Sequence, residues 1–379
     1  MQIKNRHLFR LTRFVLLKLP GLFAFFARFR KPVKRILIIK TDAIGDYILF
    51  RNFIELTAAS AKYKGYKIDL IGNRLWRDVT GKWDSEYLNT SYFIDPKSYY
   101  EAPFKTLRFG WRLFRNNYEV VLQPTYTRVF ITDGFAALTA APNIIGYQSD
   151  NEGIAPRYKN KTDKFYTQKL ILPDDAYFEF NRNRFFFERV LQQPLSINQP
   201  YLNIASTSKT DIAILPGAGE FKRGWEKEQF LQVIQRLIAT TNDTISLIGG
   251  PGEVAAGEYL QSQLPSGRVN NLINTTTLPQ LIEIMAGSRL LISNETGATH
   301  IAVAVKTPSV CILGGGHFGR FAPYPEGVSP APVCIFEKMP CYNCNWECIY
   351  KPKPTEAFPC ISAIGVDTVW QAVARFIPV

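Results

Sequence analysis

Short apolar runs alternate with amphipathic stretches along the chain from residue 36 onward. Buried strands are predicted at the β-branched runs 36–40, 67–72, 92–96, 118–124 and 143–147. Between some of these runs, the stretches 46–61 and 104–117 carry apolar residues at helical spacing. The alternation predicts the α/β class, with parallel strands flanked by helices.

The second half of the chain repeats this pattern. Strands are predicted at 211–217, 244–250, 269–274, 289–294 and 309–315, and helices at 227–241, 252–263, 278–287 and 297–305. The intervening residues 148–205 are irregular and aromatic, with one helix near 180–191. Since 379 residues exceed the roughly 250–300 that one core supports, we predict two Rossmann-like domains, 36–205 and 206–379.

Charge is concentrated in the first 35 residues. The formal net charge is +13, and residues 1–35 hold ten Lys or Arg and no acid, interleaved with apolar residues such as Leu11 and Phe25. This pattern is typical of a helix on a membrane surface, whereas a nucleic-acid-binding protein spreads its basic face over the folded body. We expect no nucleic-acid partner and a membrane-associating extension, 1–35, that contacts the membrane through residues 1–30. The alternative is a helix packed on the body of the protein.

The longest uncharged run in this extension, 19–27, is too short to cross a bilayer, which needs about 20 residues. Four of the six cysteines lie near the C-terminus, and no signal-peptide pattern is apparent. A reducing, cytoplasmic setting fits these features. Together with the basic extension, they predict peripheral association with the inner face of the cytoplasmic membrane.

Ligands of parallel sheets bind in the loops after the strands. The first such loop, residues 40–50, has a single glycine, Gly45, and lacks the G-x-G-x-x-G spacing of NAD or FAD sites. It offers two carboxylates, Asp42 and Asp46. Asp46 at a helix start is either a capping residue or a candidate base.

The second loop, residues 215–230, combines exposed backbone N–H groups with positive charge. Gly217, Ala218 and Gly219 precede Lys222 and Arg223. A helix N-terminus with nearby cations suits a diphosphate. The alternative is a solvated turn with exposed basic residues.

Two further loops carry carboxylates. In 247–260 a glycine turn that includes Gly250 precedes Glu253, which could accept hydrogen bonds from ribose hydroxyls. In 293–305 Glu295, Thr296, Gly297 and His300 crowd a strand end and the next helical turn. A buried, hydrogen-bonded histidine is the alternative for His300.

These motifs together resemble glycosyltransferase family 9, the heptosyltransferases of lipopolysaccharide core assembly. They are D-x-x-G-D at 42–46, P-G-A at 216–218 before basic residues and a Trp, G-G-P-G-E at 249–253 and S-N-x-T-G-x-x-H at 293–300. The resemblance covers roughly residues 36–376. It implies a GT-B fold, two Rossmann-like domains with a cleft between them. It also implies inverting, metal-independent transfer from a nucleotide-diphosphate sugar, ADP-heptose or similar, to a lipopolysaccharide-core or other lipid-linked glycan.

The resemblance also implies residue roles. Asp46, next to Gly45, matches the general base, and Glu253 matches a ribose contact. Phosphate and donor-sugar contacts match a larger set, namely Gly217, Ala218, Lys222, Arg223, Gly250, Thr296, Gly297 and His300. Glu295 stands where the family usually has Asp, which leaves the donor sugar open. Whether Lys222 or Arg223 contacts the phosphate is also open, with Arg223 slightly favoured.

Four cysteines, Cys341, Cys344, Cys348 and Cys360, follow one another with spacings of 2, 3 and 11 residues. Such spacing suits a structural zinc site, and disulfides or free thiols are the alternatives. Nothing in the sequence ties this segment to the strand-end loops, so we expect no catalytic role and no cofactor for the transfer itself.

Two other functions compete with sugar transfer. A GT-B-like nucleotide-sugar epimerase would form its product without any acceptor. A non-catalytic family member would bind a nucleotide sugar only, and Glu295 in place of Asp keeps this alternative open. The retained Asp46 argues against it, because a binding protein has no need of a base.

Overall fold

The computed structural model describes residues 3–148, 150, 152–204, 211–265 and 267–377. The chain divides into two compact units. Unit 1 comprises Met1–Ala176 and Asn181–Ser196, and unit 2 comprises Tyr177–Phe180 and Ile197–Val379. The predicted domain boundary at 205/206 falls outside the described residues. Each unit is described below by itself.

Unit 1 is built on a parallel sheet with the strand order of a Rossmann fold, β3-β2-β1-β4-β5-β6. The chain order turns back between β1 and β4, so the loops after these two strands flank the usual ligand position. The strands are β1 (Val33–Ile39), β2 (Lys67–Asn73), β3 (Thr90–Ile94), β4 (Tyr118–Gln123), β5 (Asn143–Tyr147) and β6 (Gln168–Leu170).

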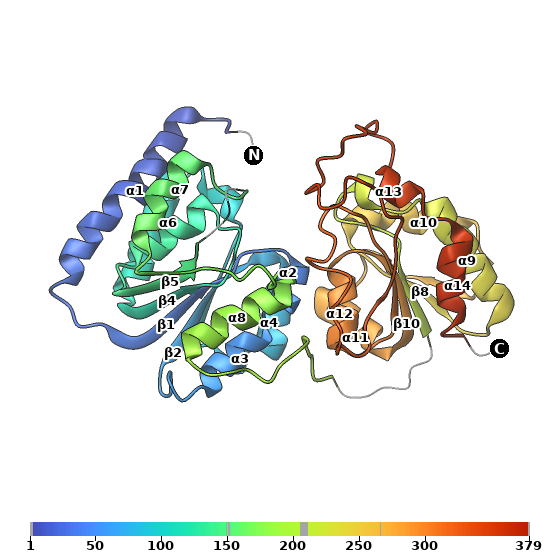
Figure 1. Cartoon of the computed structure of the whole chain (residues 1–379), viewed down its shortest axis with the longest axis horizontal. Coiled ribbons are helices and arrows are strands. Elements are labelled where there is room, and N and C mark those ends of the chain that lie inside the picture. Colours follow the sequence, from blue (N-terminus) through green and yellow to red (C-terminus); the bar gives the residue numbers. More distant parts are fainter. Residues whose placement is uncertain (1–2, 149, 151, 205–210, 266, 378–379) are drawn as a thin grey trace. The chain divides into compact units, whose positions relative to one another are not determined.

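Helices cover both faces of this sheet (Figure 1). They are α1 (Arg6–Ala27), α2 (Ile44–Ile48), α3 (Asn52–Ala59), α4 (Arg77–Trp83), α5 (Pro103–Arg115), α6 (Phe130–Leu138), α7 (Pro156–Thr162) and α8 (Glu179–Leu191), with short 3-10 helices η1 (Arg74–Trp76), η2 (Ser85–Tyr87), η3 (Pro96–Tyr99) and η4 (Asp163–Phe165). Helices α1 and α6 lie on one face, and α3, α4 and α8 lie on the other. Buried side chains of β1 alternate between the faces, as a strand covered on both sides requires.

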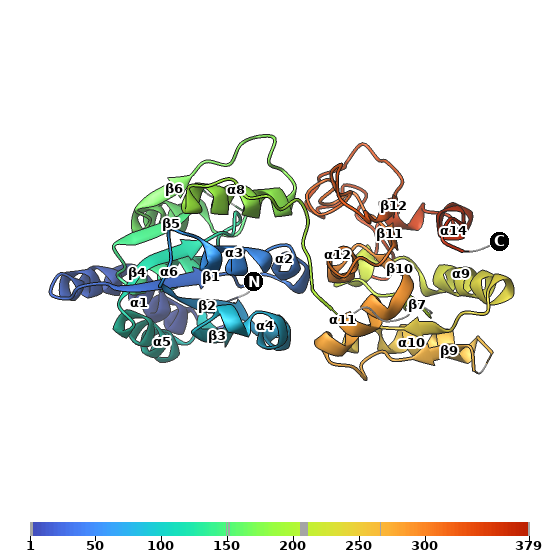
Figure 2. The same ribbon diagram turned by 90° about the horizontal axis from the view of Figure 1, so that it is seen from below.

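The N-terminal extension forms a single helix that packs on unit 1. Helix α1 begins after Asn5, whose side chain accepts hydrogen bonds from the backbone N–H groups of the first turn. It buries Val15, Leu16 and Phe23 against α5 and α6. Figure 2 shows α1 beside α5. One face of α1 is therefore packed on the body of the protein, as the alternative interpretation of this segment expected. Within the described part of the chain, no helix has both the length and the apolar character needed to span a membrane.

Unit 2 repeats the same strand order, β9-β8-β7-β10-β11-β12, again with every pair parallel. Its strands are β7 (Asp211–Leu215), β8 (Ile245–Leu247), β9 (Val269–Asn271), β10 (Ser288–Asn294), β11 (Ser309–Ile312) and β12 (Val333–Ile335). Its turning point lies between β7 and β10. The loops after these strands are 216–226 and 295–296.

The helices of unit 2 also form two layers (Figure 1). They are α9 (Lys227–Thr240), α10 (Val254–Ser262), α11 (Leu278–Gly287), α12 (Gly297–Ala304), α13 (Pro359–Ser362) and α14 (Val366–Ala374), with 3-10 helices η5 (Phe221–Arg223) and η6 (Pro251–Glu253). Helices α9, α10 and α14 pack on one face around apolar side chains of β7, β10 and β11. Helices α11 and α12 lie on the other face.

The predicted α/β class is confirmed, and the differences are local. The single helix predicted at 46–61 is divided into α2 and α3. The stretch 148–205, predicted as irregular apart from one helix, also contains α7 and β6. The prediction missed α4, α6, β12, α13 and α14 altogether.

Candidate functional site

The turning point of unit 2 is held together by Asn294, the last residue of β10. Its buried side chain donates hydrogen bonds to the carbonyl oxygens of Pro216 and Gly217, over 2.9 and 3.0 Å. The backbone N–H of Trp225 donates to its Oδ1 over 2.9 Å. Asn294 therefore fixes the loop after β7 against the end of β10. Sequence reasoning missed this role, although a polar residue that ends a buried apolar strand was a signal.

Gly217, Gly250 and Glu253, three of the predicted contact residues, come together in the structure. A side-chain carbon on Gly217 would lie 2.1 Å from Cγ of Glu253, so no larger residue fits there without a shift. The backbone N–H of Gly250 donates to Oε2 of Glu253 over 2.7 Å. The carboxylate of Glu253, which was predicted to contact ribose, therefore lies against the loop after β7. That loop also contains the predicted phosphate contacts.

The two basic residues of η5 have different partners. The ammonium of Lys222 donates to the carbonyl oxygen of Pro352 over 2.8 Å. The guanidinium of Arg223 lies 4.4 Å from the ring centre of Trp346, and its Nε lies 3.3 Å from a carboxylate oxygen of Glu220. Because Lys222 is already bound to backbone, Arg223 is the better placed of the two to meet an anion.

These contacts correct one expectation from the sequence. Pro352 and Trp346 belong to the cysteine-rich segment, and the backbone N–H of Phe358 donates to the carbonyl oxygen of Lys222 over 2.8 Å. The segment was expected to have no tie to the strand-end loops. It is in fact bound directly to the loop after β7, because the chain folds back on itself after β12.

Glu295, directly after β10, has an unusual carboxyl group. Burial raises its pKa to about 8, and the positive charge of Arg223 opposes this rise only in part. Its Oε2 atom has no hydrogen-bond partner among the described residues. A buried carboxyl oxygen without a partner is costly, which makes Glu295 a candidate contact for a ligand group.

Helix α12 begins beside this carboxyl group. Thr296 is its N-cap, and Thr296 Oγ1 accepts a hydrogen bond from the backbone N–H of Ala298 over 3.2 Å. Gly297 is the first residue of the helix. The structure thus brings Glu295, Thr296 and Gly297 to one strand end, at the positive end of a helix dipole.

His300 lies one turn further into α12 and is 4% exposed. Its Nδ1 is 2.7 Å from the hydroxyl oxygen of Tyr324. Burial lowers the pKa of His300 to about 4, against a smaller opposing effect of the Glu179 carboxylate. The imidazole is therefore neutral and packed in the unit, as the alternative interpretation of this residue expected.

In unit 1 the loop after β1 carries the two carboxylates singled out in the sequence. Asp42 accepts a hydrogen bond from Thr125 Oγ1 over 2.8 Å and lies 2.9 Å from the buried ammonium of Lys40. Asp46 lies in the first turn of α2, one residue after Gly45 and partly buried. The N-cap position of α2 belongs to Ala43, so Asp46 is not the capping residue.

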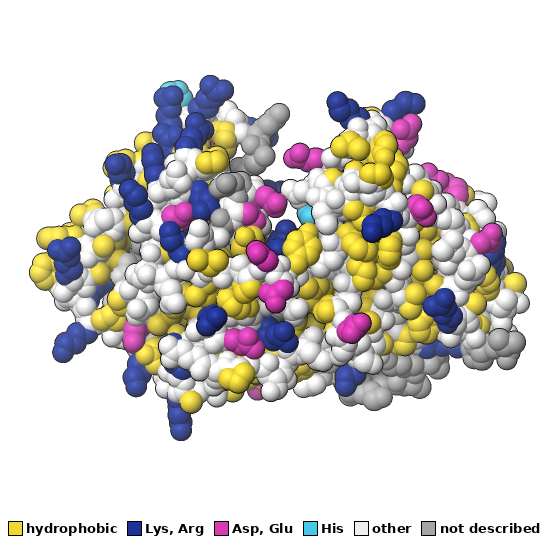
Figure 3. Space-filling view, in the orientation of Figure 1, with side chains coloured by type: hydrophobic (Ala, Val, Ile, Leu, Met, Phe, Trp, Pro, Cys, Tyr) yellow, Lys and Arg dark blue, Asp and Glu magenta, His cyan; other side chains and the backbone are white. Residues whose placement is uncertain are grey.

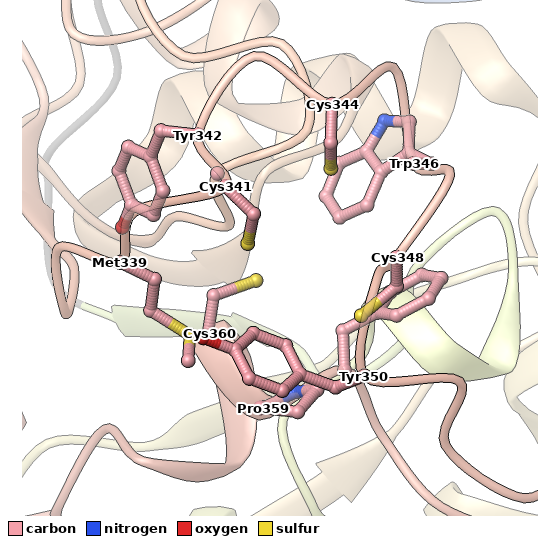
Figure 4. Close-up of a pocket in the computed structure, with 11 residues that line it drawn as sticks. Met339, Cys341, Tyr342, Cys344, Trp346, Cys348, Tyr350, Pro359 and Cys360 are labelled. Atoms are coloured by element: carbon pink, nitrogen blue, oxygen red, sulfur yellow. The ribbon is translucent and has the colours of Figure 1, made fainter.

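The four C-terminal cysteines line one pocket, together with aromatic side chains that include Trp346 and Phe358 (Figure 4). No disulfide joins any of the four in this structure. Burial is the main cause that raises the pKa of Cys341 and of Cys360, and the neighbouring cysteines add to it. Reactive thiols have lowered pKa values, so Cys341 and Cys360 do not have the character of nucleophiles.

Two Rossmann-like units, each with candidate ligand groups at its turning point, are the architecture of the GT-B class. The family model of glycosyltransferase family 9 (heptosyltransferase) matches residues 106–350. The chain belongs to this family. The resemblance found in the sequence is thereby confirmed.

Individual relatives are distant. A lipooligosaccharide heptosyltransferase 2 from Haemophilus influenzae is 29% identical over 108 residues, which is 27% of this chain and 31% of the relative. A lipopolysaccharide heptosyltransferase 1 from Escherichia coli K12 is 21% identical over 74% of this chain and 88% of its own length. The solved structure of the E. coli ADP-heptose LPS heptosyltransferase II matches with a TM-score of 0.65 at 16% identity, over 90% of this chain and 98% of that one. At this identity the structural match shows the fold, which is GT-B.

Proposed function

We propose that the protein transfers a heptose from ADP-heptose, or a similar nucleotide-diphosphate sugar, to a lipopolysaccharide-core or other lipid-linked glycan. Transfer inverts the anomeric centre and uses no metal ion in the chemical step. The donor proposal is supported by the E. coli relative, whose name specifies ADP-heptose and LPS. The observation that carries it here is the Oε2 atom of Glu295, which has no hydrogen-bond partner in the described part of the chain and lies near Arg223 and the start of α12.

The loop after β7 and the start of α12 supply the charge that a departing diphosphate needs. Arg223 provides a full positive charge, and the first backbone N–H groups of α12 and the glycine-rich turn provide oriented dipoles. Such groups stabilise the negative charge that grows on the leaving group. They take the place that a divalent cation has in other phosphate chemistry.

Glu295 is suited to the donor sugar. With a pKa of about 8 its carboxyl group is mostly protonated at neutral pH, so it can both donate and accept hydrogen bonds. A protonated group also avoids repulsion with the adjacent diphosphate. The hydroxyl groups of a sugar match this donor and acceptor pair, which supports a contact between Glu295 and the transferred sugar.

The proposed general base is Asp46. It removes the proton from the acceptor hydroxyl as that oxygen bonds to the anomeric carbon, while the bond to the diphosphate breaks on the opposite side. Asp42, the other carboxylate of this loop, is bound by Lys40 and Thr125. Loss of the carboxylate at Asp46 should remove turnover and leave donor binding intact.

Donor selection tests this proposal. Isothermal titration of the full chain with ADP, UDP, GDP and CMP, and with ADP-heptose, should give tight binding for the adenine compounds only. Incubation with ADP-heptose alone should leave the sugar unchanged. Preference for another nucleotide would overturn the donor, an altered sugar would indicate an epimerase, and no binding at all would indicate that the chain does not use a nucleotide sugar.

We further propose that the protein works at the inner face of the cytoplasmic membrane, where a lipid-linked acceptor is found. The outer face of α1 exposes Leu11, Phe14, Leu22 and Phe25, and Phe29 follows with 75% of its surface exposed. Lys and Arg side chains gather over the same helix (Figure 3). Exposed aromatic residues among basic ones suit a surface of anionic lipid.

Helix α5 extends this surface. It packs beside α1, where Trp111 contacts Phe23 at 5.8 Å between ring centres, and Trp111 remains half exposed. Phe104 of α5 is 82% exposed. Neither helix contains an acidic residue, and each basic residue near anionic lipid contributes about 1 kcal/mol. The two helices together therefore support reversible binding.

Because α1 buries part of the core, its removal would damage unit 1, and substitutions on its outer face are the better test. Phe25→Ser with Phe29→Ser should reduce sedimentation with vesicles that contain anionic lipid. Ile171→Ser is the matched control, since Ile171 is equally apolar and 73% exposed outside α1 and α5. Equal binding of both variants would contradict the membrane proposal.

A further inference from the structure

The pocket at Cys341, Cys344, Cys348 and Cys360 is not used by the proposed transfer reaction. Figure 4 shows the four side chains arranged around one space, with their sulfur atoms directed toward it. The aromatic rings of Tyr342, Trp346 and Phe358 also line this space. Four sulfur atoms in an otherwise largely apolar lining are a set of soft potential ligands.

We infer that these four cysteines bind one metal ion of the zinc or iron type, as thiolates, and that the ion orders the segment 339–360. Four thiolates are the donor set of structural zinc and of single iron sites, with tetrahedral geometry. The spacing of 2 and 3 residues brings three ligands from one loop, and Cys360 supplies the fourth from another element.

Three of the four proposed ligands lie outside helices and strands. Cys341, Cys344 and Cys348 lie in consecutive turns between β12 and α13, whereas Cys360 is buried within α13. In the described ranges, no group of three or more His, Cys, Asp or Glu side chains already has the arrangement of a metal site. Binding must therefore draw the three loop sulfurs toward the fixed Cys360, a local change in segments without helix or strand structure.

A metal ion that orders this segment would also affect the loop after β7, because the two segments are in contact. Trp346 packs against Gly316, where an added side-chain carbon would lie 2.3 Å from the indole ring, and the guanidinium of Arg223 lies 4.4 Å from the centre of its ring. The backbone N–H groups of Asn343 and Asn345 donate to the carbonyl oxygens of Gly315 and Gly316, over 2.7 and 3.0 Å. The segment is thus clamped between the end of β11 and the proposed phosphate contact.

By fixing the segment that carries Trp346, the ion would hold the guanidinium of Arg223 in position. It would not touch the reacting atoms. This second part of the inference rests on the proposed function, because it assumes that Arg223 meets the donor diphosphate. The first part, the metal site itself, does not depend on that assumption.

Metal content of the full chain tests the first part. Plasma mass spectrometry of the purified wild type should find about one equivalent of zinc or iron per chain. The variant Cys344→Ser with Cys348→Ser should lose it, and Cys334→Ser, a partly buried cysteine of β12 outside the pocket, should retain it. A wild type without metal, or with these cysteines paired as disulfides in mass spectra of the unreduced protein, would overturn the inference.

A second measurement does not depend on the variant folding. An organomercurial reagent added to the wild type should release the ion as the thiols react, which a metal-sensitive dye records. Release of one ion with the modification of four thiols is expected. Release without involvement of Cys341, Cys344, Cys348 and Cys360 in peptide mapping would overturn the site.

Nucleotide titration separates the two parts. If the ion braces Arg223, the double variant should bind ADP at least about tenfold more weakly than the Cys334→Ser control. Unchanged ADP affinity in a metal-free variant would overturn the bracing role and leave the metal site standing. A wild type that holds metal but binds no nucleotide would instead count against the proposed function.

Discussion

Glu295→Gln should change the pH dependence of stability in a defined direction. The pKa of Glu295 is raised from an ordinary value of 4.5 to about 8 by burial. An acid whose pKa is higher in the folded than in the unfolded state destabilises the fold once it ionises. The stability of the wild type should therefore decline as the pH rises from about 4.5 to about 8 and stay low above that.

The size of this effect follows from the two pKa values. At about 1.4 kcal/mol per pKa unit, the interval corresponds to at most about 5 kcal/mol, and partial solvent access reduces it. Glutamine keeps the shape and polarity of the protonated acid and does not ionise. The variant should match the wild type near pH 5 and exceed its melting temperature by up to roughly 10 °C near pH 9.

Differential scanning calorimetry of both proteins across this pH range measures the difference directly. A difference in melting temperature that does not change with pH would show that Glu295 is not a buried, neutral acid. The proposed contact with the donor sugar would then lose its main support. ADP affinity gives a second reading, since ionised Glu295 repels a diphosphate: the wild type should bind ADP more weakly above about pH 8, and the variant should not.

Four further substitutions test other parts of the account. Arg223→Ala should weaken ADP binding about ten- to a hundredfold in titration calorimetry, whereas Lys222→Ala, whose ammonium is bound to backbone, should change it less. Asn294→Ala should destabilise the protein by about 1–3 kcal/mol in urea unfolding, because it leaves the buried N–H of Trp225 without a partner. Gly134→Ala should cost about 1–3 kcal/mol in the same assay, since the added carbon would meet the Leu16 side chain of α1 at 2.4 Å; unchanged stability would contradict the packing of α1.

The parallel sheets could be predicted because their strands are short β-branched runs between amphipathic helices. Helix α6 could not, because all nine of its residues are buried and the sequence therefore lacks a polar face. Thr132, Asp133 and Gly134 also lower its helix propensity. Hydrophobic periodicity identifies helices at a surface and fails for helices inside the protein.

The candidate site, too, could be predicted only in part. The positions of Gly217, Glu253 and Glu295 at strand ends follow from the order of strands. These residues could therefore be identified as candidates from the sequence alone. The direction of a side chain does not follow in this way: His300 belongs to the same motif, yet its ring is buried against Tyr324. The bond between Lys222 and the cysteine-rich segment joins residues 130 apart in irregular loops, which carry no periodic signal.

The most direct test of the proposed function is transfer itself. The full chain and its Asp46→Asn variant should be incubated with ADP-heptose and a set of heptose-deficient lipopolysaccharide cores, with products identified by mass spectrometry and their anomeric configuration by NMR. We predict that the wild type adds one heptose with inversion and releases an equal amount of ADP, while the variant binds ADP-heptose normally and forms no product. Transfer by the variant at a rate close to the wild type, or retention of the anomeric configuration, would contradict the assignment of Asp46 as the base of an inverting heptosyltransferase.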